Sequence, residues 1–391
     1  NSGDAITSGV RNTAVGHNSL GGTDDGHDNT AVGNSALAAN CGDNNVAVGK
    51  DALTVFTGSD ATAVGNDALK ACTTGAENVA VGSAALGAVV DAHYNTAVGT
   101  SALAADCGSS NVAVGRLALN VFTGDDATAI GTSAADAATT AGNLTAVGRN
   151  AAGSVTDSDD HTAIGDNALA SCTTGAQNTA LGSNAAFALT GSSNVMLGMN
   201  SGYYATTTDD CVAIGRNALL GASGNTTGNQ NVAIGSYCLD AATSATENVA
   251  IGAYAGSAAT TASYSTFIGK NSGDAITTGN QNTALGYSTL SASDDGNNNT
   301  AVGNAALGTG NCGDNNTAVG FNALVAYTGG YNTAVGANAA DAVTDAERIT
   351  AIGRDALGLA VSQDDCTAVG YAALDAATSG DGCTAVGSHA L

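Results

Sequence analysis

The sequence contains no proline and no tryptophan, and only 4% of its residues are aromatic. The missing proline excludes a collagen helix, which also needs a three-residue glycine period that this chain lacks. Disorder is disfavoured as well, because disordered chains are usually rich in proline or charge and poor in β-branched residues. So few aromatic side chains cannot fill a wide core. These absences favour an ordered but thin structure.

Positive charge is also scarce. Only 9 of the 391 residues are Lys or Arg against 34 Asp and Glu, which gives a net charge of −25. Nucleic acids and anionic membrane surfaces are recognised by basic patches, so neither is an expected partner. No run of 18 apolar residues is present, and we predict no membrane insertion of this segment.

Cysteine and histidine show no metal-binding spacing. The nine cysteines include no C-x-x-C pair, and the five histidines are isolated. We therefore predict no metal and no cofactor. The odd number of cysteines leaves at least one unpaired within the chain. Cys366 and Cys383 are 17 residues apart, one repeat length, and are a possible disulfide.

What the sequence does contain is one repeat, written 23 times. Its motif is Asn-Thr/Val-Ala-Val/Ile/Leu-Gly, first seen as NTAVG at residues 12–16. We call the last residue the motif glycine. Fifteen of the intervals between motif glycines are 17 residues, six are 16 and one is 20. A fixed interval is typical of a solenoid, in which each coil must return to the same point one strand spacing along the axis.

The triplet before each motif glycine predicts a short strand, because it is β-branched and bounded by Asn and Gly. Strand alternation places its first and third residues on one face and its Ala on the other. We expect the larger aliphatic and Thr side chains to face the coil interior, joined by Leu from a second short strand such as NSAL at 34–37. The predicted core residues are Val15, Val32, Val48, Val64 and Val81. The predicted inter-chain Ala strip comprises Ala14, Ala31, Ala47, Ala63 and Ala80.

Asn and Gly frame the strand for separate reasons. Glycine permits a corner that a side chain would forbid. The Asn side chains satisfy turn backbone groups and, stacked from coil to coil, can form an amide ladder. The sequence thus predicts an all-β parallel β-solenoid, or β-roll, of about 23 coils in a single continuous domain over residues 1–391. We expect it to be a segment of a longer fibre, with a longer loop in one coil at 219–230.

The pattern N-[TV]-A-[VIL]-G-x-x-[AS]-[LA] resembles the head repeats of trimeric autotransporter adhesins of the YadA type. It is also similar to the NTAxGxxAL repeats of phage tail fibres and bacterial surface fibre proteins. The resemblance implies a left-handed β-solenoid in which three chains associate into a stiff fibre. It further implies an extracellular, cell-surface or virion-surface location. The implied role is to extend an attachment function away from that surface.

Several residues break the uniformity of the repeat. Six of the nine basic residues follow a motif glycine directly: Lys50, Arg116, Arg149, Arg216, Lys270 and Arg354. Acidic pairs precede the strand at 125–126, 159–160, 209–210 and 364–365. We interpret these charges as solvent-exposed residues at the corners of the coils. The alternatives are a stripe of charge that recognises a partner, and calcium bound by the acidic pairs between stacked turns. Clustered tyrosines and the loop at 219–230 are candidate contacts for a glycan or a host protein.

The sequence therefore favours a structural role. No nucleophile–base pair or phosphate loop interrupts the repeat, and we predict that the protein is not an enzyme. Our leading hypothesis is a homotrimeric shaft of an extracellular or virion-surface fibre, whose partner is another copy of itself. Two alternatives stay open: an adhesin surface that binds glycan or host protein on the rod itself, and an ice-binding solenoid.

Overall fold

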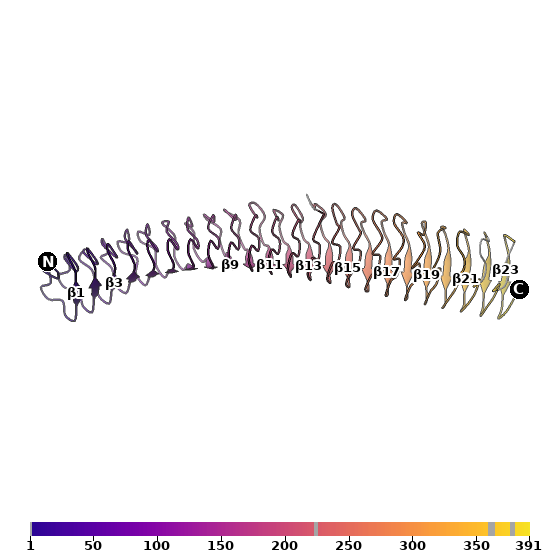
Figure 1. Ribbon diagram of the computed structural model, residues 1–391, viewed down its shortest axis with the longest axis horizontal. Helices are drawn as coiled ribbons and strands as arrows, with labels where there is room; N and C mark the ends of the chain where they lie inside the picture. The colour runs from indigo at the N-terminus through magenta and orange to yellow at the C-terminus, as the bar shows by residue number, and fades with distance from the viewer. Residues whose placement is uncertain (1, 223–225, 359–363, 376–379) are drawn as a thin grey trace. The chain divides into compact units, whose positions relative to one another are not determined.

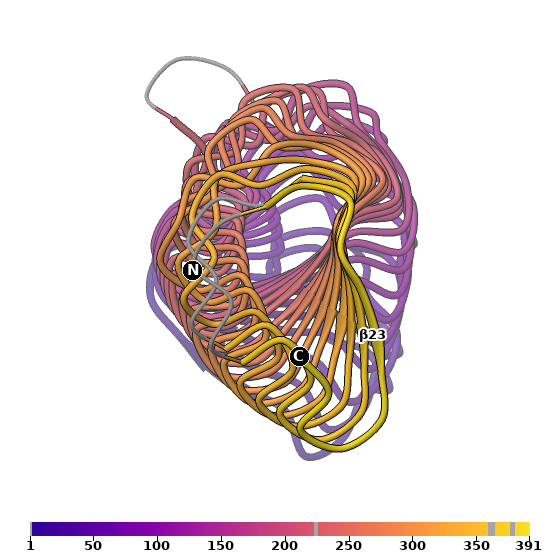
Figure 2. The same ribbon diagram turned by 90° about the vertical axis from the view of Figure 1, so that its right-hand side faces the viewer.

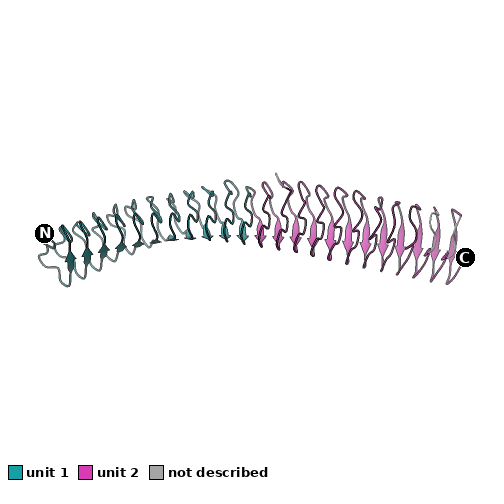
Figure 3. Cartoon of the chain, viewed as in Figure 1, with its two compact units in different colours: residues 1–190 teal, residues 191–391 magenta. Residues whose placement is uncertain are grey.

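The computed structural model describes residues 2–222, 226–358, 364–375 and 380–391. These residues contain no helix and 23 parallel strands of three residues each, one for every repeat (Figure 1). The chain divides into two compact units, Asn1–Thr190 and Gly191–Leu391 (Figure 3). The fold is an all-β parallel β-solenoid, as predicted. A single domain over 1–391, the handedness and the number of chains stay predictions.

Unit 1 contains β1 to β11, each paired in parallel with the next. The strands are β1 (Thr13–Val15), β2 (Thr30–Val32), β3 (Val46–Val48), β4 (Thr62–Val64), β5 (Val79–Val81), β6 (Thr96–Val98), β7 (Val112–Val114), β8 (Thr128–Ile130), β9 (Thr145–Val147), β10 (Thr162–Ile164) and β11 (Thr179–Leu181). The register pairs each motif residue with its own counterpart, as Ala14 with Ala31.

Unit 2 contains β12 to β23, paired in the same way. The strands are β12 (Val195–Leu197), β13 (Val212–Ile214), β14 (Val232–Ile234), β15 (Val249–Ile251), β16 (Thr266–Ile268), β17 (Thr283–Leu285), β18 (Thr300–Val302), β19 (Thr317–Val319), β20 (Thr333–Val335), β21 (Thr350–Ile352), β22 (Thr367–Val369) and β23 (Thr384–Val386). Within each unit the successive coils follow nearly the same closed path (Figure 2).

The strand faces are the reverse of those predicted. The Ala residues of the expected inter-chain strip are the core: Ala31, Ala47, Ala63 and Ala80 are fully buried, and only Ala14, in the first coil, is half-buried. The expected core residues point outward, with Val15 and Val81 exposed and Val32, Val48 and Val64 half-buried. The prediction was wrong because it assigned the larger side chain to the interior by size. The interior opposite the strand is already filled.

What fills it is the residue four positions after the motif glycine. This residue is Leu in 16 coils, and its side chain is buried in all of them except the last, where Leu391 is exposed. The segment that carries it is a turn rather than the predicted second strand, and the buried Leu residues at this position have left-handed backbones with φ between 46° and 56°. Coil-to-coil hydrogen bonds hold them there, as from Leu37 N to Ala52 O at 2.9 Å. A buried Leu on one side leaves room for only a methyl group on the other.

The two coils that lack Ala at the central strand position support this account. Met196 and Phe267 replace it, and both are fully buried. In these coils the Leu position is glycine: a Cβ on Gly202 would lie 2.6 Å from Met196 Sδ, and one on Gly273 would lie 2.3 Å from Phe267 Cδ1. Where the strand carries a large side chain, the turn opposite it therefore carries a glycine, as close packing requires.

Candidate functional site

The outer side of the strands is a regular surface of each unit. Two columns of side chains stand on it: Thr or Val from the first strand position and Val, Ile or Leu from the third. We call these two columns the outer face. Several of its aliphatic side chains are exposed, including Ile130 and Leu181 in unit 1 and Ile251 and Leu285 in unit 2. A regular row of large apolar side chains on a surface is a feature of interaction sites.

The outer face carries no charge, since none of the described strands contains Asp, Glu, Lys or Arg. It also carries the Thr column, as in Thr30 and Thr62, which are half-buried and point away from the core. The expectation that Thr faces inward is therefore wrong, for the same reason as for Val. An uncharged face on a chain of net charge −25 lets two copies approach without direct repulsion there.

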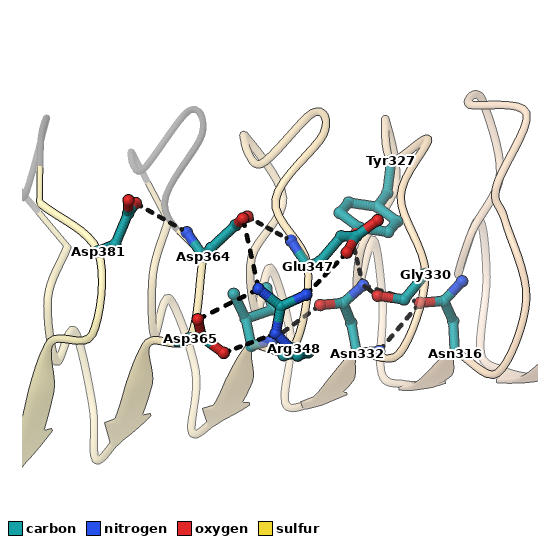
Figure 4. Close-up of polar contacts among 10 residues, drawn as sticks. Asn316, Tyr327, Gly330, Asn332, Glu347, Arg348, Asp364, Asp365 and Asp381 are labelled. Atoms are coloured by element: carbon teal, nitrogen blue, oxygen red, sulfur yellow. Dashed lines mark hydrogen bonds and ion pairs between the residues drawn. The ribbon is translucent and has the colours of Figure 1, made fainter.

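The Asn column at the start of the strands does form a ladder, but most of its bonds join a backbone amide to the Asn side chain of the preceding coil, rather than joining two stacked side-chain amides as predicted. Asn29 N donates to Asn12 Oδ1 and Asn45 N donates to Asn29 Oδ1, both at 2.9 Å. In unit 2 Asn332 N donates to Asn316 Oδ1 (Figure 4). Ile349 N in the next coil donates to Asn332 Oδ1. Where another residue replaces Asn, it often accepts the same bond: Cys211 Sγ and Ser265 Oγ do so from the next coil. The ladder satisfies buried backbone amides.

A second ladder, which the sequence reasoning missed, explains the acidic pairs. The residue six before the motif glycine accepts a hydrogen bond from the backbone of the preceding coil. Glu347 N donates to Asp364 Oδ1 at 2.8 Å and Asp364 N to Asp381 Oδ1 at 3.2 Å (Figure 4). Gly142 N likewise donates to Asp159 Oδ1 at 2.7 Å. The signal was available, because Asp, Asn, Ser, Thr or His recurs at this position in most repeats.

The second member of each acidic pair has a different role. Asp126, Asp160, Asp210 and Asp365 all adopt left-handed backbones, with φ between 56° and 63°. Asp365 also accepts hydrogen bonds from Arg348 of the preceding coil at 2.7 and 3.1 Å (Figure 4). This contact lowers the pKa of Asp365 below its usual value. The pairs thus serve the turns themselves, which agrees with the solvated-corner interpretation.

Acidic side chains also line two hollows, the kind of surface at which a cation could bind. One, of about 250 Å³, is lined by Asp341, Asp355 and Asp375 with Tyr371 and His389. The other, of about 420 Å³, lies beside Asp25, His27 and Asp43. Among the described residues, no group of three or more His, Cys, Asp or Glu side chains is arranged to hold a metal ion.

The cysteines lie inside the coils. Eight are buried, and only Cys383 is partly accessible. Burial raises the pKa of Cys72 to about 11 and that of Cys238 to about 12, which suppresses the reactive thiolate. Cys366 and Cys383 occupy adjacent coils as predicted, but both are thiols, and Cys383 N donates to Cys366 Sγ at 3.4 Å. Buried cysteines of this kind fill space.

Two of the clustered tyrosines of unit 2 form a stack rather than an open platform. The rings of Tyr237 and Tyr254 are parallel, with centroids 5.2 Å apart, and the Arg216 guanidinium lies 4.9 Å from the Tyr237 centroid. These ring faces are thus turned toward neighbouring coils. A sugar stacks on a free ring face, so this geometry does not favour the glycan interpretation at these residues.

The long loop at 219–230 lies partly outside the described residues, which omit 223–225. Within this loop, Leu219 and Thr226 are buried. Thr226 forms an isolated bridge with Ala205 and donates its hydroxyl to Ala242 O at 2.9 Å. The chain therefore rejoins the stack immediately after the insertion.

One half-buried carboxyl is expected to make the stability of unit 2 depend on pH. Burial raises the pKa of Asp240 to about 6, whereas an unfolded Asp titrates near 3.9. The folded state therefore holds the proton more tightly, and the free energy of unfolding falls as pH rises from about 4 to 6. We expect Asp240→Asn to remove this loss and to gain about 1 kcal/mol on the wild type at pH 7, since the side chain is only partly buried.

Denaturant unfolding of both proteins between pH 4 and 7 measures this effect. Parallel stability curves for the two proteins would contradict the assignment to Asp240.

The described part of the chain holds no helix that could span a lipid bilayer. No protein-family model matches the sequence. A search of curated proteins likewise finds no significant match.

Proposed function

We propose that this chain is the repeat shaft of an extracellular or virion-surface fibre, which assembles with copies of itself, as a homotrimer, through the outer face. Adding repeats lengthens the shaft without requiring new kinds of contact, because each coil contacts only its neighbours. The role is structural and adhesive: the shaft carries an attachment function away from the surface that bears it.

The observation that carries the proposal is the outer aliphatic column. The solenoid buries its small Ala side chains and leaves the larger Val, Ile and Leu side chains outside. Burying one half-exposed aliphatic side chain contributes on the order of 1 kcal/mol. Association costs roughly 4–15 kcal/mol, so the contact becomes favourable only because the column repeats over many coils. Another copy of the chain offers a surface with the same repeat spacing.

Light scattering coupled to size-exclusion chromatography tests the assembly. We expect a mass of three chains. A monomer that persists at high micromolar concentration would overturn the proposal.

A substitution in the outer face should weaken this assembly selectively. Ile130, at the end of β8, is 41% exposed, and Val121, in a turn of the same unit, is 40% exposed. We expect Ile130→Lys to raise the concentration of half-dissociation by about tenfold or more, because the charge would be buried at the interface. Val121→Lys is the matched control and should leave the mass unchanged. Equal behaviour of the two variants in sedimentation would count against the outer face as the interface.

Ice binding is the second candidate, and one observation favours it more than the sequence did. The Thr column faces outward beside the aliphatic column, at the regular spacing of a parallel sheet. A flat array of hydroxyl and methyl groups can order water. Measurement of thermal hysteresis decides between the two: a freezing-point gap would support ice binding, and its absence would remove this candidate.

A further inference from the structure

The outer face is bordered by two columns of charged residues of opposite sign. The column five residues before the motif glycine lies at the start of the strands, and the column just after it lies at their end. We call the first the acidic edge and the second the basic edge. This asymmetry bears on how two copies of the chain can meet.

In unit 1 the acidic edge presents five exposed carboxylates: Asp28, Asp60, Glu77, Asp126 and Asp160. The basic edge presents Lys50, Arg116 and Arg149. Each edge also carries one residue of the opposite sign, Arg11 on the acidic edge and Asp166 on the basic edge. Both form an ion pair with a residue of their own edge, Arg11 with Asp28 and Asp166 with Arg149. Lys50 of the basic edge is likewise bound to Asp51 of its own chain. The acidic edge of unit 1 therefore keeps a net negative charge, and Arg116 is the basic-edge residue that has no ion pair among the described residues of unit 1.

In unit 2 the pattern recurs. The acidic edge presents Asp210, Glu247 and Asp365, and the basic edge presents Arg216, Lys270 and Arg354, all exposed. The exception, Arg348 on the acidic edge, is paired with Asp365.

The axial positions of the two edges also correspond. Every residue of the basic edge has an acidic-edge residue in its own coil or in an adjacent one. Arg116 follows β7, and Asp126 precedes β8 in the next coil. Arg216 and Asp210 flank the same strand, β13. One coil is about 4.8 Å along the stack, which a long side chain can span.

We infer that the charged edges fix how copies associate: the acidic edge of one copy lies against the basic edge of the next, with the chains parallel and nearly in register. This inference rests on the proposed function. In a cyclic, parallel arrangement each contact joins unlike edges. In an antiparallel pair packed face to face, with the two-fold axis parallel to the strands, acidic edge would meet acidic edge and basic edge would meet basic edge. Like charges placed opposite one another exclude that arrangement.

The pair Arg116 and Asp126 offers the cleanest test. Among the described residues neither makes an ion pair within its own chain. We expect Arg116→Glu and Asp126→Arg each to raise the concentration of half-dissociation about tenfold at low salt, and to do so less at high salt. The double variant, which exchanges the two charges, should return to within about threefold of the wild type. Asp91→Arg, an exposed carboxylate in a turn of unit 1, is the control and should change little.

Cross-linking gives an independent reading of orientation. In the doubly substituted Arg116→Cys, Asp126→Cys chain, mild oxidation should join neighbouring copies into a closed three-chain product on a non-reducing gel. Each variant that carries only one of these two substitutions should stay monomeric on that gel.

The outcomes separate the two proposals. A monomeric wild type would overturn both the assembly and this inference. An intact oligomer in which the charge exchange fails to rescue, or in which Arg116→Cys cross-links to itself, would overturn the edge pairing and leave the assembly standing.

Discussion

We expect Gly115→Ala to be among the most destabilising single substitutions in unit 1. Gly115 follows β7 with φ at +133°, a conformation that only glycine adopts readily. A Cβ at this position would lie 2.3 Å from the carbonyl oxygen of Gly131 in the next coil. That oxygen belongs to the backbone and cannot move without shifting the ladder. Backbone strain and the clash together should cost about 4 kcal/mol.

The effect is best measured locally. Native-state hydrogen exchange reports the free energy of opening for the amides of β7 and β8, even where a repeat protein does not unfold in one step. Gly387→Ala is the matched control, because Gly387 has a similar φ of +130° but its nearest neighbour would be Ala390 Cβ at 3.9 Å. We expect the control to cost only the backbone strain, about 1–2 kcal/mol. Equal costs at both positions would show that the contact between coils does not matter.

The second large effect is expected where Met196 replaces the usual Ala. We expect Met196→Ala to cost about 2–5 kcal/mol, because Gly202 opposite it has no side chain to fill the space. Gly202→Leu alone should also destabilise, since its Cβ would meet the Met196 side chain at 2.6 Å. Together the two substitutions recreate the common coil with Ala on the strand and Leu on the turn.

A double-mutant cycle tests this compensation. The double variant should be within about 1 kcal/mol of the wild type, which corresponds to a coupling of about 3 kcal/mol or more between the two positions. Exchange of the amides of β12 and β13 gives the four values. Additive effects would mean that the two side chains do not share the same space. The native Gly202 already has a φ of +61°, close to that of the Leu residues in other coils, so Leu adds little new backbone strain.

The repeat interval was sufficient to predict the solenoid. Spacing by 16 or 17 residues, a β-branched triplet and a glycine after it leave few other folds, and the strands of the structure coincide with that triplet in all 23 repeats. A ladder along the Asn column was likewise predictable, because an amide repeated at one position of a stack lies within hydrogen-bond reach of the coils next to it. These features depend on local geometry and on the repeat period, and both can be read directly from the amino-acid sequence.

The candidate site was predicted in the right strand but on the wrong side. Alternation shows that Ala14 and Val15 face opposite ways, yet it does not say which way is inward. A signal was present in the two exceptions: Met196 and Phe267 occur in coils with Gly202 and Gly273 at the Leu position. Read together, they indicate that the strand centre and the turn compete for one volume, which places Ala inside.

The amino-acid sequence by itself determined the period, the parallel register, the glycine corners and the uncharged strand, because each of these follows from residues close together in one repeat. Only the tertiary structure decided which face is the core, that the Leu turn has a left-handed backbone, and that the acidic pairs support a second ladder. Those outcomes depend on how much room one coil leaves across its interior and on which atoms of the next coil come within hydrogen-bond reach. Neither quantity is contained in the pattern of a single strand.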